Sequence, residues 1–498
     1  MRVLLISPPL HSLYHAARVI IPPLGLLYVA GALERAGHEV EVRDMTFYDG
    51  PRTYDDADII GLTCTTPQYN AALRYAREAH EAGKLVMMGG SHVTFTTHTT
   101  LRLPYVDFIV RGEGEITAVD LVDSLEREGR NFQPSTIPSL SWYDKNTGQV
   151  VDNQRRPDVR TVDDLPMPAR HLLDVTPYKV TRLRDRPAIT MITSRGCPFN
   201  CTFCSVPTMY QQRKWRGREA VAAVDEMEYL EREYGFGGVL LVDDLITVNV
   251  QRIHDLCDEI LERGLKVYWW CQSRADILMK NLDMVEKMAR AGCSNVFLGL
   301  ESGNPEVLKH YNKRLATDTG REAVDLLRQH GIRALTSFIL GDVDETPEQI
   351  RTTIDYAVEL DAHQAQFSLL TPYPGTQTWE QVKDRIFEDD WDRFDGTHIV
   401  FHRTHMDAHE IKEAIRSAYR RFYVRSERIG RMLKGLNGLS VSSLWSMMRV
   451  LSRSNDHEKE ILDPVSSLIP LSPISRDEWL STAIFDDACE EDVEEVVA

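Results

Sequence analysis

Apolar and polar positions alternate with two different periods along the first 130 residues. Five short apolar runs have the length and residue types of buried strands, and three longer segments repeat apolar residues at helical spacing. Strands that alternate with helices favour a parallel sheet covered on both faces. We therefore predict a doubly wound, Rossmann-like α/β domain over residues 1–130, with ligands at the C-terminal strand ends. The predicted strands are Arg2–Ser7, Glu39–Arg43, Asp58–Thr63, Leu85–Met88 and Asp107–Val110, and the predicted helices are Leu24–Ala36, Gln68–Ala82 and Glu115–Glu126.

The same alternation returns over residues 188–385. Amphipathic segments such as Arg218–Tyr234 and Arg321–Gln329 separate six further apolar runs. Right-handed crossovers place consecutive strands of this kind in one parallel sheet, curved or closed. Because barrel folds carry their chemistry at the C-terminal ends of the strands, we look for functional residues there. The predicted strands are Ala188–Thr193, Gly238–Val242, Lys266–Cys271, Asn295–Gly299, Arg333–Leu340 and Gln364–Leu370.

The segments between and after these two domains have other patterns. Residues 131–187 are predicted to be a linker that contains a small hairpin of Leu140–Tyr143 and Val150–Asp152. Residues 386–470 are predicted to form a helical C-terminal domain. Residues 471–498 end in a run of acids that is typical of a disordered tail.

Composition limits the classes of protein to consider. The 498 residues carry a formal net charge of −18, which weighs against a nucleic-acid partner. Eight cysteines without dense, even spacing weigh against a secreted disulfide scaffold. No apolar run approaches the length of a spanning helix, and Pro8-Pro9 interrupts the apolar start, unlike a signal peptide. We expect a cytoplasmic, reducing environment.

Residues 420–453 depart from this acidic average. They carry eight basic residues against one acid, together with aromatic and Met side chains. A basic amphipathic stretch can lie on an anionic membrane surface. Helices that pack against the barrel, with their arginines in solvent, explain the same residues. The sequence leaves peripheral membrane contact and ordinary packing both open.

Cys197, Cys201 and Cys204 are the strongest chemical signal in the chain. They follow the first barrel strand and are close enough to turn toward one metal centre. A [4Fe–4S] cluster normally takes four Cys ligands, so three would leave one iron open to an outside ligand. A zinc knuckle or a loop of unbridged thiols is the alternative. Zinc usually requires a fourth Cys or His at close spacing, and the next, Cys257, lies in a predicted helix far downstream.

Polar residues also follow four successive barrel strands. A helix N-cap or a turn explains each of them taken alone. Their recurrence at four neighbouring C-terminal ends favours a shared site. These residues are Asp243-Asp244, Gln272-Ser273-Arg274, Glu301-Ser302-Gly303 and Gly341-Asp342.

Three motifs together resemble a known family. The Cys loop, with Phe203 before its last Cys, resembles the signature of radical SAM enzymes. The string Gly-Gly-Ser-His-Val-Thr, residues 89–94, followed by Val-Arg-Gly-Glu-Gly-Glu, residues 110–115, resembles the cobalamin-binding domain fused to many of them. The order of domains over about residues 1–430 resembles the B12-binding radical SAM proteins. It is nearest to the group of the anaerobic magnesium-protoporphyrin monomethyl ester cyclase and the lipid- and hopanoid-modifying enzymes.

The resemblance implies a partial (β/α)6 barrel, a [4Fe–4S] cluster and S-adenosylmethionine (SAM) chelated by its open iron. Reduction of the cluster would then cleave SAM to a 5′-deoxyadenosyl radical, in an oxygen-poor setting. Asp243 and Asp244 match the position that approaches the methionine amino group, although the usual Gly-Gly-Glu is absent. Arg274, Glu301 and Ser302 match positions that often hold the ribose and carboxylate of SAM.

The resemblance also implies cobalamin in residues 1–130. Gly89, Gly90 and Gly114 would allow close approach of the backbone to the corrinoid tail. The family's cobalt-ligating Asp-x-His-x-x-Gly pattern is absent. His92, like His11 and His15, could reach the cofactor, but many relatives hold cobalamin without a His ligand, so we expect none on cobalt. A retained fold that has lost the cofactor is the alternative, as is a nucleotide site, although neither G-x-G-x-x-G nor a P-loop is present.

Three functional classes follow from this resemblance. The first is methyl transfer to an unactivated carbon of a large apolar substrate, such as a lipid or tetrapyrrole. The second is radical oxidation, cyclisation or C–C bond formation without methyl transfer. The third is a non-catalytic corrinoid carrier or sensor, against which the intact Cys triad weighs. An enzyme of this kind would also need an electron donor such as flavodoxin or ferredoxin.

Overall fold

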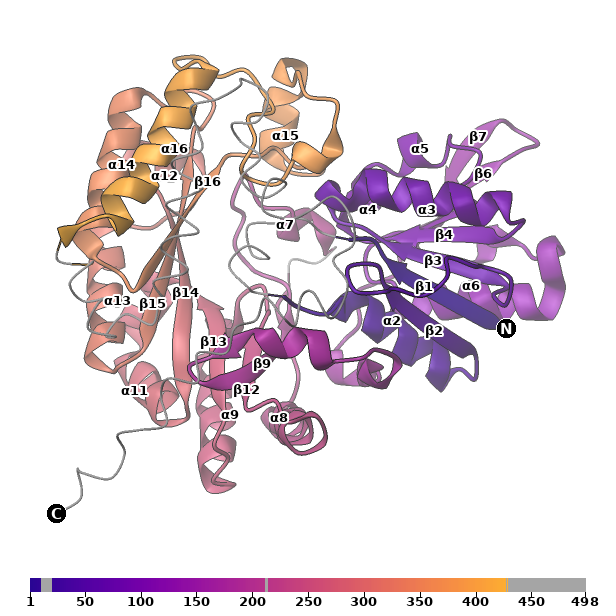
Figure 1. Cartoon of the computed structure of the whole chain (residues 1–498), viewed down its shortest axis with the longest axis horizontal. Coiled ribbons are helices and arrows are strands. Elements are labelled where there is room, and N and C mark those ends of the chain that lie inside the picture. The colour runs from indigo at the N-terminus through magenta and orange to yellow at the C-terminus, as the bar shows by residue number, and fades with distance from the viewer. Residues whose placement is uncertain (10–19, 211–213, 427, 429–498) are drawn as a thin grey trace.

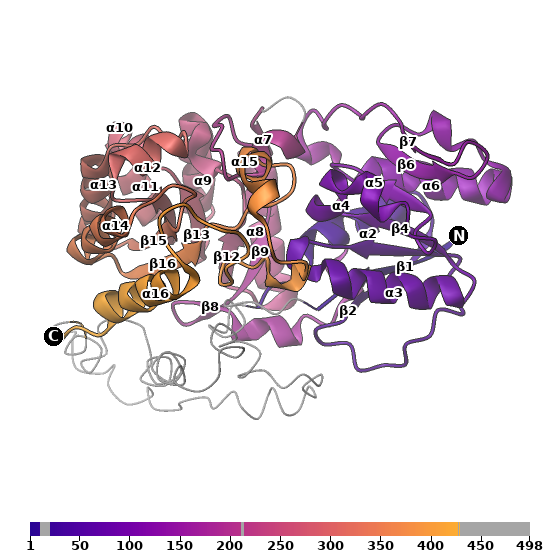
Figure 2. The same ribbon diagram turned by 90° about the horizontal axis from the view of Figure 1, so that it is seen from above.

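The computed structural model describes residues 1–9, 20–210, 214–426 and 428 of the chain. It contains two large sheets, and Figure 1 shows the N-terminal sheet in indigo and violet beside the second sheet in pink and salmon. Figure 2, turned by 90°, shows the same two parts side by side, with α7 (Val206–Met209) and α15 (Gln377–Val382) between them. No described helix is both long enough and apolar enough to cross a membrane.

The N-terminal sheet is doubly wound, as predicted. Its strands lie in the order β2-β1-β3-β4-β5-β6-β7, and the first five are parallel. The apolar side chains of α2 and α6 form one core with one face of the sheet, and those of α3 form another with the opposite face. The bounds are β1 Arg2–Ser7, β2 Glu39–Asp44, β3 Ile59–Thr63, β4 Leu85–Gly89, β5 Phe108–Val110, α2 Leu24–Arg35, α3 Tyr69–Glu81, α4 Ser91–Phe95, α5 Thr97–Thr100 and α6 Glu115–Glu128.

The predicted hairpin is present and belongs to this first sheet. Strand β6 (Leu140–Asp144) pairs antiparallel with β5, and β7 (Gln149–Asp152) pairs antiparallel with β6. The boundary predicted at residue 130 therefore leaves out two strands that are hydrogen-bonded to the N-terminal domain.

The second sheet is a half-barrel. Six parallel strands follow one another from β9 to β16, and the short β8 (Arg182–Leu183) pairs antiparallel with β9 at one edge. All six strands predicted from the sequence are confirmed, each end lying within two residues of its predicted position. The bounds are β9 Arg186–Met191, β12 Gly238–Leu241, β13 Tyr268–Ser273, β14 Cys293–Glu301, β15 Arg333–Leu340 and β16 Gln364–Leu369.

Among the described residues, seven helices pack on the outer face of the half-barrel. Alternate residues of each strand, such as Trp269 and Phe367, are completely or almost completely buried in a single core beneath these helices. In β13 and β14 the intervening residues, such as Trp270 and Phe297, point to the inner face because successive side chains of a strand alternate, and they are only partly buried. The helices are α8 Ala220–Tyr234, α9 Val250–Glu262, α10 Ala275–Lys280, α11 Leu282–Arg290, α13 Thr317–Gln329, α14 Pro347–Leu360 and α16 Ala408–Tyr423. The short helix α12 (Pro305–His310) packs instead in a separate cluster with Val343, Leu370 and Phe394.

The described part of the basic stretch 420–453 packs against the barrel. Phe422 is fully buried, and the Tyr423 hydroxyl donates a 2.8 Å hydrogen bond to the carbonyl of Ala365. Arg421 pairs with Asp355 on α14. Packing therefore explains the residues up to Tyr423, while residues 429–453 and the predicted acidic tail 471–498 lie outside the described residues.

Candidate functional site

The loop that carries the three cysteines follows β9 at the C-terminal edge of the half-barrel. Cys197, Cys201 and Cys204 are all unbridged and partly exposed. The segment after α12 holds this loop, because Thr202 N–H donates to the Tyr311 carbonyl at 3.1 Å. The side-chain amide of Asn312 donates to the carbonyl of Asn200 at 2.8 Å. These two hydrogen bonds fix the loop that carries the thiols to the segment between β14 and β15.

The donor set fits an iron–sulfur cluster. Burial raises the pKa of all three thiols, that of Cys204 to about 12. Without a cation these groups would therefore stay protonated at neutral pH, and thiolates require the positive charge of a metal beside them. Three soft sulfur ligands on one loop suit iron or zinc.

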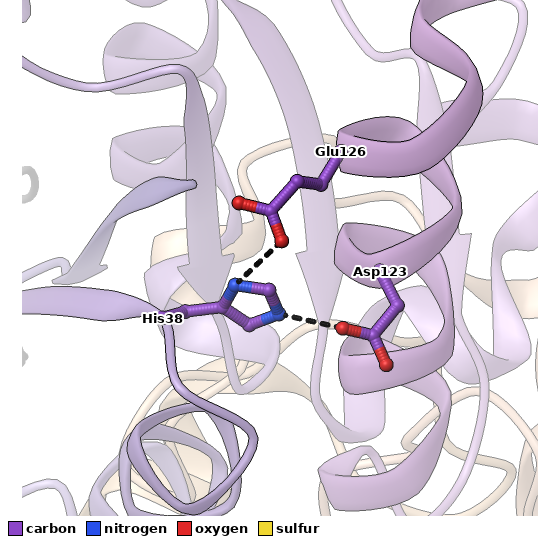
Figure 3. Close-up of side chains that lie close together, drawn as sticks. All are labelled: His38, Asp123 and Glu126. Carbon is purple, nitrogen blue, oxygen red and sulfur yellow. Dashed lines mark hydrogen bonds and ion pairs between the residues drawn. The ribbon is translucent and has the colours of Figure 1, made fainter.

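A second group of possible ligand atoms lies on the N-terminal domain, away from the Cys loop. In the described part of the chain, possible metal-ligand atoms of His38, Asp123 and Glu126 all lie within 4.8 Å of one another. Figure 3 shows the imidazole between the two carboxylates, with Asp123 3.0 Å from Nε2 and Glu126 3.8 Å from Nδ1. The N-terminal ammonium contacts both Nδ1 of His38 and the Glu126 carboxylate, so all three groups already have partners within the protein.

The thiol sulfurs of Cys197, Cys201 and Cys204 do not all lie within 4.8 Å of one another. This spacing bears on whether the loop would bind zinc or a cluster. Four sulfurs around one zinc at about 2.3 Å lie within about 4 Å of one another. The thiols of the described loop are not gathered this tightly. A cubane, in which each Cys binds a different iron, spaces its thiolates more widely, and the described loop is compatible with such spacing.

Asp243 and Asp244 lie directly beside the Cys loop, and both hold its backbone. One Asp243 oxygen accepts hydrogen bonds from the hydroxyls of Thr193 and Ser194, and the other accepts from Thr193 N–H at 2.6 Å. Asp244 accepts from Gly196 N–H at 2.7 Å. Burial raises the pKa of both carboxyls, and the hydrogen bonds oppose this effect. Asp243 is fully engaged with the protein, whereas Asp244 retains one oxygen for a ligand.

Arg274 and Glu301 converge on the same edge. The Arg274 guanidinium lies 3.9 Å from the centre of the Phe199 ring in the Cys loop and donates to the Lys313 carbonyl at 2.9 Å. Glu301, in a left-handed conformation (φ 66°), pairs with the Lys313 ammonium at 2.7 Å. Sequence reasoning missed Lys313, which lies in a loop after a short helix and belongs to no motif.

Phe203 and Ser302 have structural partners. The Phe203 ring meets Tyr311 edge-to-face, with ring centres 5.2 Å apart. The Ser302 hydroxyl lies 2.8 Å from the Thr353 hydroxyl and accepts from Asn304 N–H at 3.0 Å. Ser302 is therefore engaged within the protein, and Phe203 supports the Cys loop by packing.

Gly89, Gly90 and Gly114 of the N-terminal domain differ in whether neighbouring protein atoms exclude a side chain. Gly90 has φ +104°, and a Cβ there would lie 2.5 Å from the carbonyl oxygen of Cys64. Neighbouring backbone therefore requires Gly90. A Cβ at Gly89 or Gly114 would approach no protein atom closer than 3.4 Å. A Cβ at either position would make ordinary van der Waals contact with Val110 or Val29. The neighbouring protein therefore does not require glycine there, and close approach of a bulky ligand would.

His92 is buried next to these glycines. Its Nδ1 lies 3.2 Å from the Thr66 hydroxyl, and its Nε2 is buried without a hydrogen-bond partner. The ring packs against Tyr69 and Trp391, with centres 4.2 and 4.7 Å away. Burial lowers the pKa of His92 from 6.5 to about 3, so the imidazole is neutral. A neutral ring with one unpartnered nitrogen fits a polar ligand, and the other two candidates, His11 and His15, lie outside the described residues.

The loops of the two sheets face one another. Gly375, in the loop after β16, packs so closely on Phe95 of α4 that a Cβ there would lie 2.3 Å from the ring. Asn70 of α3 donates to Asp390 at 2.7 Å. The C-terminal strand ends of the first sheet therefore lie next to those of the half-barrel.

Comparison with protein families agrees with this division. Residues 191–357 match the model of the Radical SAM superfamily, and residues 11–122 match the model of the B12 binding domain.

Three characterised or named relatives match along most of the chain. An uncharacterized methyltransferase of Pyrococcus horikoshii is 36% identical over 85% of this chain and 93% of its own length. The anaerobic magnesium-protoporphyrin IX monomethyl ester cyclase of Cereibacter sphaeroides is 29% identical over 85% of this chain and 71% of its own length. The hopanoid C-3 methylase of Methylococcus capsulatus is 26% identical over 80% of this chain and 76% of its own length.

Two solved structures share the fold. The radical S-adenosylmethionine methyltransferase TsrM of Kitasatospora setae, with cobalamin and a [4Fe–4S] cluster bound, has a TM-score of 0.64 and 21% identity, covering 77% of this chain and 78% of its own. The cobalamin-dependent S-adenosylmethionine radical enzyme OxsB has a TM-score of 0.68 and 18% identity, covering 94% of this chain and 74% of its own.

We predict that the three cysteines hold one cluster. Anaerobically reconstituted protein should contain about four iron atoms per chain. Cys201→Ala should lose both the cluster absorbance and reductive cleavage of SAM. Cys257→Ala, which changes a buried core thiol, is the matched control and should keep both. A triple Cys→Ala variant that still cleaves SAM would contradict the assignment.

Gly90 and Gly114 should respond differently to an added methyl group. Gly90→Ala forces a left-handed backbone and a contact with Cys64, so we expect a loss of about 1–3 kcal/mol in the free energy of unfolding. Gly114→Ala should leave stability within about 1 kcal/mol of the wild type but weaken cobalamin binding. Urea denaturation and equilibrium cobalamin titration measure the two effects, and equal stability losses would refute the distinction.

The buried imidazole of His92 should make the apoprotein less stable in acid. Its pKa is about 3 when folded against an ordinary 6.5. As the pH falls through this range the unfolded chain binds a proton that the folded chain does not, so stability decreases with falling pH. We expect a loss of about 2 kcal/mol between about pH 7 and pH 5 from this group. Urea denaturation of His92→Gln should lack this part of the pH dependence, and identical slopes in both proteins would contradict it.

Proposed function

This chain belongs to the B12-binding radical SAM enzymes, and from that premise we propose that it methylates an unactivated carbon of a large apolar substrate. The cofactors of this enzyme class are a [4Fe–4S] cluster, SAM and cobalamin. When bound, these cofactors would supply two reactive groups. One is a 5′-deoxyadenosyl radical, which removes a hydrogen atom from the substrate, and the other is a methyl group for transfer. The protein's part is to bind these groups and to orient them around one carbon.

Methyl transfer is supported by the relative from Pyrococcus horikoshii, which is 36% identical to this chain. That protein is named a methyltransferase and matches along nearly its whole length. A methylase that acts on hopanoids is also among the relatives. The second candidate is oxidative cyclisation or C–C bond formation without methyl transfer, because cyclases of magnesium-protoporphyrin monomethyl ester match with 29% identity.

For the cluster and SAM, we propose that Cys197, Cys201 and Cys204 bind three irons. Arg274, Glu301 and Lys313 surround the same loop, and the charges of all three act on the Cys201 thiol. We assign the binding of the polar groups of SAM to Glu301 and Lys313, together with the free oxygen of Asp244. Asp243, Phe203 and Arg274 act by holding the loop, through Thr193, Tyr311 and Phe199. Ser302 holds the start of α12 instead, through Thr353 and Asn304.

For cobalamin, we propose the loops after β4 and β5. Gly89 and Gly114 leave their backbone accessible, whereas Gly90 fixes the turn. We assign to His92 a hydrogen bond from its unpartnered Nε2 to a polar group of the corrinoid. We expect no imidazole from the described part of this domain on cobalt, because the Asp-x-His-x-x-Gly pattern is absent.

The inner face of the half-barrel supports a large apolar substrate. Trp270 and Phe297 meet edge-to-face on this face, with ring centres 6.1 Å apart. Leu335 and Ile339 of β15 have the same orientation and are also only partly buried. The same face also carries the partly buried Gln272, Asn295, Gln366 and Ser368. Aromatic and aliphatic walls with polar groups placed among them bind flat or extended molecules that are largely apolar. A lipid or a tetrapyrrole fits this description.

We further propose flavodoxin or ferredoxin as the electron donor. In the described part of the chain the cysteines outside the loop, Cys64, Cys257, Cys271 and Cys293, are buried in apolar cores and offer no second cluster. We propose that the external donor reduces the cluster directly. Peripheral membrane contact would rest on residues 429–453 alone, which lie outside the described residues, because the stretch before them packs inward.

The reaction can be tested with isotopically labelled methyl donor. Anaerobically reconstituted enzyme, supplied with cobalamin and SAM carrying a CD3 group, should convert a component of cell extract into a product heavier by one CD3. Mass spectrometry detects this product, and Cys201→Ala is the control that should form none. A product that has lost hydrogen and gained no CD3 would refute methyl transfer and establish the oxidative alternative.

A further inference from the structure

We infer that Arg195 is a positioning residue that fixes the Cys loop to the cobalamin-binding domain, and that Glu113, Glu115 and Arg216 complete the same network. This inference rests on the proposed function, because it assumes that the two domains act on one substrate. It assigns a role to the two acids of the Val-Arg-Gly-Glu-Gly-Glu string, residues 110–115.

Arg195 connects the two domains directly. It lies two residues before Cys197 and donates to both acids of the loop after β5. The distances are 3.1 Å from Nη1 to Glu113 Oε1 and 2.6 Å from Nη2 to Glu115 Oε1. The guanidinium also lies 5.3 Å from the centre of the Tyr28 ring on α2. One side chain of the Cys loop therefore contacts three residues of the other domain.

Arg216 completes the network from the neighbouring strand. It is the register partner of Arg195 in the small sheet of β10 (Ser194–Arg195) and β11 (Arg216–Gly217). Its Nη1 lies 2.9 Å from Glu113 Oε2 and donates to the Val159 carbonyl at 2.9 Å. Val159 N–H in turn donates to Glu113 Oε2 at 2.9 Å. Each Glu113 oxygen thus binds a different arginine of the half-barrel domain.

The network is closed to solvent and balanced in charge. The side chains of Arg195, Glu113, Glu115 and Arg216 are 9%, 11%, 5% and 8% exposed, with two positive and two negative charges. Burial alone would raise the pKa of Glu113, but Arg216 and Arg195 hold it below its ordinary value. Buried ion pairs fix geometry, because removal of one partner leaves an uncompensated charge that the protein must rearrange to solvate.

The loop between Arg195 and the first cysteine cannot absorb a displacement. Gly196 has φ +90°, and its Cα lies so close to the Lys214 carbonyl that a Cβ would be 2.3 Å from that oxygen. Its N–H is bonded to Asp244. On the opposite side, Glu115 is the first residue of α6, directly after Gly114. A shift of one domain is therefore transmitted to the thiols of the other.

A purely stabilising role is the competing explanation, and a matched variant separates the two. Arg218 is also 8% exposed and pairs with Glu226 and Asp163, but with no residue of the cobalamin-binding domain among its hydrogen-bond partners. Arg195→Met and Arg218→Met each remove one buried guanidinium from an ion pair. Only Arg195→Met removes a connection between the Cys loop and the loops after β4 and β5, which we call the cobalamin loops.

The experiment compares wild type, Arg195→Met, Arg195→Lys, Glu115→Gln and Arg218→Met as reconstituted holoenzymes. We measure the ratio of 5′-deoxyadenosine to methylated product, with cluster absorbance and cobalamin content as controls. Hydrogen exchange of the peptide that contains residues 111–116 gives a readout that needs no substrate. Glu115→Gln keeps the shape of the side chain and serves if Arg195→Met does not fold.

In Arg195→Met and Glu115→Gln we expect cluster and cobalamin to be retained, while the ratio rises by on the order of 100-fold because the two reacting groups lose alignment. Exchange at residues 111–116 should become faster in both. Arg195→Lys should recover part of the coupling, and Arg218→Met should keep the wild-type ratio and exchange. Equal ratios and equal exchange in Arg195→Met, Glu115→Gln and wild type would overturn the inference. A wild-type enzyme that forms no methylated product would refute the proposed function instead, and the exchange data would still decide the inference.

Discussion

A parallel sheet places the C-terminal ends of all its strands at one edge, and in this chain two such edges face each other. The loops after β4 and β5 of the first sheet meet the loops after β9 and β16 of the second. Apart from Lys313, which follows the short helix α12, the groups that we assign to a cofactor lie on one of these loops or at the C-terminal end of a strand. Because backbone hydrogen bonds of the strands fix where the loops begin, the arrangement of the functional residues follows from sheet topology.

Much of the fold could be predicted from the sequence, because the side-chain alternation of the strands is strong. In β13 the odd-numbered residues Trp269 and Cys271 are buried while Trp270 is not, and such periodicity locates a strand without tertiary information. The hairpin β6–β7 was also expected, but its addition to the first sheet was not. A short antiparallel edge pair has no sequence feature that specifies its neighbour, so only the three-dimensional pairing with Phe108–Val110 determines its domain.

The candidate site was predictable in position but not in detail. The spacing of the cysteines indicated the cluster, and Asp243 and Asp244 lie beside that loop as expected. The sequence does not show that both carboxylate oxygens of Asp243 accept hydrogen bonds from Thr193 and Ser194. These partners lie about 50 residues away and are brought together only by the fold. The pairing of Arg195 with Glu113 and Glu115, across 82 and 80 residues, was inaccessible for the same reason.

The central claim is that the Cys loop and the cobalamin loops serve one reaction centre. Electron paramagnetic resonance of holoenzyme that contains both Co(II) cobalamin and the reduced cluster tests it most directly, because two nearby paramagnets enhance each other's spin relaxation. We predict a broadened, fast-relaxing Co(II) signal in the wild type and an unperturbed signal in cobalamin-loaded Cys201→Ala. A Co(II) signal that is identical in the two proteins, with the cluster shown to be reduced in the wild type, would contradict the account.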